Sequence, residues 1–252
     1  TYSVKLTSTH ISFSFDDMSK IDFQHKSNRC IGIDLNPNFI GVSVLEFDSN
    51  DDYKVLDTKM FDIEKPAVRS NKATDHPNSV YLHNKLRHET IEITKSILNF
   101  CKSWNVKFVF LEDLNFKQGD SGNGHGFNRL VKNKWLKGLF QEQLKKRLDL
   151  YGFKHFDVKP NYSSVIGNLQ HDFTDPVNAS IEIARRGFEL IIKKNKKFYP
   201  DIRIKEKHGE QWKQTHVGPP ESWKEVFIWI KNSGLKYRVS LEECLHSYGV
   251  FS

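Results

Sequence analysis

The stretch "CIGIDLNPNFIGVSV" (residues 30–44) constrains the fold of this chain more than any other segment. Its β-branched and apolar residues predict two buried strands, joined by a short turn at Asn36-Pro37-Asn38. Asp34 nevertheless lies inside the first strand, where an unpaired charge is costly enough that such groups are normally paired or bound to a metal. Asp34 therefore either caps the turn at the end of the strand or meets something positive.

Strand and helix patterns alternate along the rest of the chain. A third strand follows the first two, and the order then becomes helix, strand, helix, strand, helix, with a short amphipathic helix around Trp223 nearer the C-terminus. Hairpin strands followed by strand–helix units predict a mixed sheet with helices packed on it. The segments are "YKVLDTKMFDI" (53–63), helix 80–104, "VKFVFLEDL" (106–114), a helix with Leu136, Phe140, Leu144 and Leu148 on one face, "FKHFDVKP" (153–160), and helix 176–194.

Charge and cysteine usage narrow the class of protein. The formal net charge is +7 and the pI is near 9.1, which favours a polyanionic partner. The three cysteines, Cys30, Cys101 and Cys244, are far apart and form no paired motif, so we expect no zinc site. Such a scattered set fits a reducing compartment, and we expect a cytoplasmic protein. No apolar run reaches membrane-spanning length.

Three carboxylates stand at positions that converge in this strand order. Asp34 lies near the end of the first strand, Glu112 ends the first strand that follows a helix, and Asp175 begins the third helix. In open α/β sheets, ligands gather outside the carboxyl ends of strands where the topology changes direction. Clustered carboxylates stay ionised together only if cations join them, and hard oxygen ligands suit Mg²⁺ or Mn²⁺.

Each carboxylate also has a structural alternative. Asp34 could cap the turn at residues 36–38, and Asp113, which points to the opposite face from Glu112, could be the ligand instead. Asp175 followed by Pro176 is typical of a helix N-cap and first helical residue. Only the combination of the three favours a site.

The same segments resemble the RuvC-like nucleases of the RNase H superfamily. "IGIDLNPNFIGVSV" is similar to the first motif of TnpB-type transposon-associated nucleases and type V CRISPR effectors, and "FVFLEDLNF" is similar to the second. "VKPNYSSVIGNL" followed by "DPVNASIEIARRG" resembles the third motif. The resemblance covers about residues 29–190.

The resemblance implies a fold, an activity and a set of residues. The fold is an RNase H-like (RuvC-type) mixed five-stranded sheet with helices packed on it. Asp34, Glu112 and Asp175 are the implied catalytic metal ligands, with Asp172 as a fourth ligand and two Mg²⁺ or Mn²⁺ ions as cofactors. The implied activity is cleavage of DNA, including branched or single-stranded DNA, by two-metal hydrolysis. The implied source is a mobile element or phage.

The chain also departs from the TnpB pattern. No zinc ribbon interrupts "VIGNLQHDFT", where His171 reads as a loop residue, and a guide RNA is expected only if a guide-binding region precedes these residues. We therefore expect a β hairpin or β-module remnant over 1–28, a nuclease domain over 29–197 and a helical extension over 198–252. The alternatives are a Holliday-junction-type resolvase acting as a homodimer, or a TnpB-like DNA-binding protein that does not cleave.

Basic residues near the motifs are candidates for phosphate contacts. They lie in the second helix, "RLVKNKWLKGLFQEQLKKR" (129–147), and in the third helix, and a solvated helix face is the alternative for all of them. The candidates are Arg129, Lys132, Lys134, Arg185 and Arg186.

Overall fold

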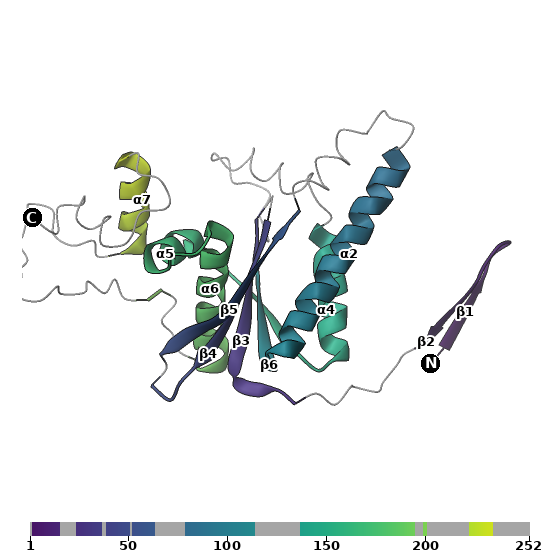
Figure 1. Cartoon of the computed structure of the whole chain (residues 1–252), viewed down its shortest axis with the longest axis horizontal. Helices are drawn as coiled ribbons and strands as arrows, with labels where there is room; N and C mark the ends of the chain where they lie inside the picture. The colour runs from purple at the N-terminus through teal and green to yellow at the C-terminus, as the bar shows by residue number, and fades with distance from the viewer. Residues whose placement is uncertain are drawn as a thin grey trace, which may run out of the picture.

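The computed structural model of the chain describes residues 2–15, 24–36, 39–50, 52–63, 79–113, 137–194, 199–200 and 222–233. A five-stranded mixed sheet with the strand order β5-β4-β3-β6-β7 forms its centre (Figure 1). The first three strands of the sheet are antiparallel neighbours, and β6 and β7 run parallel to β3. The predicted mixed five-stranded sheet is confirmed. Its strands are β3 (Lys26–Leu35), β4 (Phe39–Phe47), β5 (Tyr53–Asp62), β6 (Val106–Glu112) and β7 (Lys154–Val158).

Helices cover both faces of the sheet, as Figure 1 shows. Helices α2 (Ser79–Ser103) and α4 (Lys137–Leu150) pack on one face, and α6 (Asp175–Gly187) packs on the other, continued by the π-helix η1 (Phe188–Ile192). The third helix predicted from the sequence is therefore α6 and η1 together. None of the helices in the described ranges is long and apolar enough to cross a membrane.

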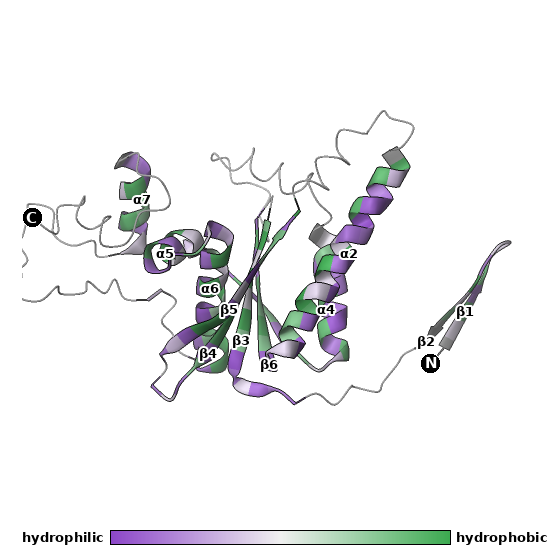
Figure 2. Ribbon diagram, viewed as in Figure 1, coloured by the Kyte–Doolittle hydropathy of each residue, from purple (hydrophilic) through white to green (hydrophobic). Residues whose placement is uncertain are grey.

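The alternation of side chains along β3 explains why the sheet has two cores. Ile31, Ile33 and Leu35 join the core under α2 and α4, whereas Cys30 joins the core under α6. In Figure 2 apolar residues concentrate in the central strands, while α2 alternates between apolar and hydrophilic residues along its length. A strand that is buried on both faces becomes almost continuously apolar, which is why Asp34 stands out in it.

The segment before α6 differs from the expectation. The sequence predicts a short loop held against the third helix, but residues Ser163–Gln170 form a helix, α5. Its apolar side chains pack with α7 (Trp223–Ser233), the amphipathic helix predicted around Trp223, and its backbone lies against α6 at Gly167, so only the expectation of a loop is wrong. An eight-residue helix has little intrinsic stability, so this one depends on packing that the local sequence does not reveal. The shared cluster contains Val165, Ile166, Leu169, Trp223, Val226 and Ile230.

The N-terminal residues form the predicted hairpin. β1 (Tyr2–Leu6) and β2 (Ile11–Phe15) pair antiparallel in a separate two-stranded sheet. The division of the chain at residues 28 and 197 remains a prediction.

Candidate active site

Asp34 and Glu112 lie side by side on neighbouring strands. Ile33 pairs with Leu111 in the parallel ladder of β3 and β6, so the next residue on each strand stands beside its counterpart. The alternation of both strands turns Asp34 and Glu112 to the face covered by α6. The sheet therefore brings together the two carboxylates that the sequence places 78 residues apart in the chain.

Asp34 is a strand residue and not a turn residue. It pairs with Gly41 in the β3–β4 ladder, and only 6% of its surface is exposed. Burial raises the pKa of the Asp34 carboxyl well above its usual range, and the negative charges of Glu112 and Asp175 raise it further. Asp34 therefore lies in the strand, and the charges of both other predicted carboxylates act on it.

Glu112 reaches across from its own strand to β3. Its Oε2 accepts a hydrogen bond from the backbone N–H of Leu35 at 3.0 Å, and 8% of the residue is exposed. Asp113 lies one residue beyond the strand, where its backbone N–H donates to the carbonyl of Val158 at 2.8 Å. Of these two acidic residues, Glu112 is the one whose charge raises the pKa of Asp34, so Glu112 rather than Asp113 is the neighbour of Asp34.

Asp175 comes to the same end of the sheet because α6 lies directly on the strands. A Cβ atom built on Gly41, the pairing partner of Asp34, would lie 2.0 Å from the carbonyl oxygen of Pro176. Only a glycine at this position lets the first turn of α6 approach so closely. Thr174 is the N-cap residue and Asp175 the first helical residue, so the reading of Asp175 as the N-cap is wrong.

The donor set fits a hard divalent cation in its chemistry. Three carboxylates lie toward the same end of the sheet, and burial together with the charges of Glu112 and Asp175 raises the pKa of Asp34, which is the electrostatic situation that a bound cation relieves. Within the described ranges, no three His, Cys, Asp or Glu side chains stand close enough to hold a metal ion as they are. The side chains would therefore have to move together to enclose one.

Asp172 is not among the charges that raise the pKa of Asp34. It is exposed, and its charge acts on His171. The imidazole Nε2 of His171 lies 3.2 Å from the hydroxyl of Tyr53, in a hydrogen bond. Burial lowers the pKa of His171, while the charges of Glu182 and Asp172 oppose the shift. His171 is therefore a packed residue at the end of α5.

The basic candidates divide into two groups. Arg129, Lys132 and Lys134 lie outside the described residues. Arg185 and Arg186 are 7% and 0% exposed, so the expectation of a solvated helix face is wrong for them.

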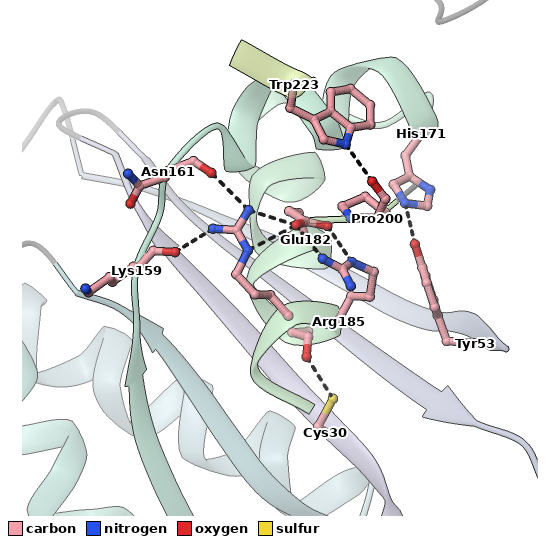
Figure 3. A network of polar contacts seen from close by, with 11 residues as sticks. Cys30, Tyr53, Lys159, Asn161, His171, Glu182, Arg185, Pro200 and Trp223 are labelled. Atoms are coloured by element: carbon pink, nitrogen blue, oxygen red, sulfur yellow. Dashed lines mark hydrogen bonds and ion pairs between the residues drawn. The ribbon is translucent and has the colours of Figure 1, made fainter. Parts of the chain in front are cut away.

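Both arginines bind Glu182 instead of facing solvent (Figure 3). The guanidinium of Arg186 also donates to the carbonyls of Lys159 and Asn161, which ties α6 to the segment between β7 and α5. A guanidinium that is buried and already paired has no surface for a phosphate, so we correct the phosphate-contact prediction for this pair.

Some solved structures are similar in fold. RuvC of T. thermophilus, solved with a Holliday junction, is 11% identical over 65% of this chain and 96% of that chain, with a TM-score of 0.43. Cas12f1, solved with single guide RNA and target DNA, is 13% identical over 65% and 40%, with a TM-score of 0.41. An Aquifex aeolicus Ppx/GppA protein is 10% identical over 56% and 38%, with a TM-score of 0.30.

These similarities concern the fold alone. At such identities and TM-scores they say nothing of what this chain binds or cleaves. No protein-family model matches the chain, and no curated protein is significantly similar to it.

Sequence reasoning missed three residues that shape the site. Gly41 admits α6 to the sheet, and Asn168 and Asn178 bond in series to Asp175. The available signal was the placement of two amides and a glycine within apolar segments, where polar or small residues need a structural reason.

Proposed function

We propose that the chain is a divalent-metal-dependent nuclease domain of the RuvC-like, TnpB-related type, with Asp34, Glu112 and Asp175 as its metal ligands. The observation that supports the proposal is that Asp34 and Glu112 directly follow the paired residues Ile33 and Leu111, while α6, which begins with Asp175, docks on Gly41 opposite Asp34. The choice of DNA as substrate rests on the resemblance of the sequence motifs and on the net charge of +7.

The protein would position the carboxylates before any substrate arrives. Asp34 and Glu112 stand on adjacent central strands, and Asp175 stands on a helix docked on glycines. Ligands on such rigid elements are held more accurately than ligands on loops. When bound, Mg²⁺ or Mn²⁺ would supply Lewis-acid stabilisation of the phosphate oxygens and lower the pKa of water.

A cleavage assay tests the proposal. The protein is incubated with end-labelled single-stranded, duplex and four-way-junction DNA in Mg²⁺, in Mn²⁺ or in EDTA. We expect cleavage in either metal, none in EDTA, and loss of cleavage in Asp34→Asn, Glu112→Gln and Asp175→Asn.

Asp157→Asn is the matched control for these variants. Asp157 pairs with Leu111, one residue before Glu112, and its carboxylate bonds to Lys145 of α4, on the other face of the same sheet. Loss of cleavage in this control to the same extent, or binding of DNA without cleavage in either metal, would overturn the proposal. Selective cleavage of the junction by a dimer would instead support the resolvase alternative.

A further inference from the structure

Two buried asparagines connect the backbone before α6 to the carboxylate of Asp175. Asn178 on α6 and Asn168 on α5 are 3% and 6% exposed. The Nδ2 of Asn178 donates to the Oδ1 of Asn168 at 2.9 Å, and the Nδ2 of Asn168 donates to the Oδ1 of Asp175 at 2.5 Å. The bonds run in one direction, from α6 through α5 and back to the first residue of α6.

The backbone of Phe173 determines this direction. Its N–H donates to the Oδ1 of Asn178 at 3.1 Å, and its carbonyl accepts from the Nδ2 of Asn178 at 2.9 Å. A backbone N–H can only donate and a carbonyl can only accept, so the amide of Asn178 has one orientation. The oxygen of Asn168 must then face Asn178, and its NH₂ group must face Asp175.

The alternative is that the pair only joins two helices. The helices are in close contact beside it, since a Cβ atom on Gly167 would lie 2.2 Å from the carbonyl of Asn178. Apolar side chains, however, could fill this contact without burying two amides, which are costly unless fully bonded. The donor that reaches Asp175 is also neutral, so it orients the carboxylate without adding a positive charge that would compete with a cation.

We propose that Asn168 and Asn178 are positioning residues that orient the Asp175 carboxylate to receive a divalent cation. This inference rests on the proposed function. The bond from Asn168 holds Oδ1, and we assign Oδ2 to the cation. Hydrogen-bond partners of metal ligands have such effects in general, and their loss typically weakens metal affinity or activity about 10- to 100-fold.

The test measures how tightly the full chain binds Mn²⁺ in the absence of DNA. Isothermal titration calorimetry and the electron paramagnetic resonance signal of free Mn²⁺ both report the binding. Asn168→Leu keeps a similar volume and removes the donor. We expect its Mn²⁺ affinity to fall about tenfold or more at a temperature where it is folded. Asn178→Asp keeps the size and the acceptor for the Phe173 N–H but loses the donor to Asn168 and to the Phe173 carbonyl. It should weaken binding in the same direction, and it replaces Asn168→Leu if that variant does not fold.

Ser180→Ala is the matched control. Ser180 is buried in the same helix, and its hydroxyl donates to the carbonyl of Val177 in that helix at 2.7 Å. The control should lose some thermal stability and keep wild-type Mn²⁺ affinity. If Asn168→Leu and Asn178→Asp lose stability but bind Mn²⁺ as the wild type does, the pair only joins the helices and the inference is wrong.

Asp175→Asn separates failure of this inference from failure of the proposed function. If it abolishes Mn²⁺ binding while both asparagine variants bind normally, the metal site stands and the positioning role falls. If Asp175→Asn itself binds Mn²⁺ normally, the proposed metal site is wrong and the positioning role falls with it.

Discussion

Glu112 Oε2 accepts a hydrogen bond from the backbone N–H of Leu35, the residue that follows Asp34, at 3.0 Å. The bond draws the Glu112 side chain from β6 across to the end of β3, where the parallel ladder has its last pairs. Two carboxylates thus lie at one end of a rigid sheet, where burial and then the charges of Glu112 and Asp175 raise the pKa of Asp34. The predictions below follow from this arrangement and from the way α6 is held against it.

Replacing Asp34 with asparagine should not destabilise the metal-free protein. The variant removes a carboxyl whose ionised form is disfavoured by burial and by the charges of Glu112 and Asp175, so the melting temperature in EDTA at neutral pH should stay equal or rise. Differential scanning fluorimetry of the variant and of wild type measures this directly. A fall of many degrees would show that Asp34 is a structural residue instead.

Gly41→Ala should be destabilising, because its Cβ atom would collide with the backbone of Pro176. We expect a loss of about 1–3 kcal/mol in the free energy of unfolding, as for other overpacked sites, together with a displaced Asp175. Urea unfolding measures the loss. The control is Gly138→Ala in α4, where nothing lies within 4 Å of the added atom and the helix should be unchanged or slightly more stable. Equal stability of the two variants would contradict the close docking of α6.

Glu182→Gln should be among the most destabilising single changes in α6. It leaves the buried guanidinium groups of Arg185 and Arg186 without their shared counter-charge, and breaking a buried ion pair from one side costs about 3–5 kcal/mol. The control is Glu142→Gln, which breaks an exposed pair with Lys146 on α4 and should change stability little. Chemical denaturation at neutral pH compares them, and a small loss for Glu182→Gln would mean that the cluster is not as buried as described.

The stability of the protein should fall in mild acid through His171. Burial lowers the pKa of its imidazole in the folded protein, with Glu182 and Asp172 opposing and the Tyr53 hydroxyl in contact. The stability that a neutral His171 provides is therefore complete above the ordinary histidine pKa of about 6.5 and is lost as the pH falls through the lower folded value. Unfolding curves of wild type and His171→Gln between about pH 7.5 and pH 5 measure this. Parallel losses in both proteins would exclude the effect.

Much of the architecture could be predicted from the sequence, because it depends on local periodicity. The five strands of the sheet and helices α2, α4, α6 and α7 follow from apolar patterns that belong to each segment itself. The strand-end positions of Asp34 and Glu112 followed in the same way, since each ends an apolar run. Helix α5 did not, because eight residues around Gly167 have no local preference strong enough to outweigh a loop.

The tertiary structure alone decided what surrounds the carboxylates. It paired Asp34 with Gly41 and linked Asp175 to Asn168, and it placed α6 on Gly41, which is remote from that helix in the chain. It also buried Arg185 and Arg186, whose charge in the sequence suggested solvent, because Glu182 lies one helical turn before them. The secondary structure of a segment depends on the period of its own apolar residues. The contacts of a side chain depend instead on which segments fold against one another. That is why the sequence could indicate the acids but not the amides and glycines that hold them.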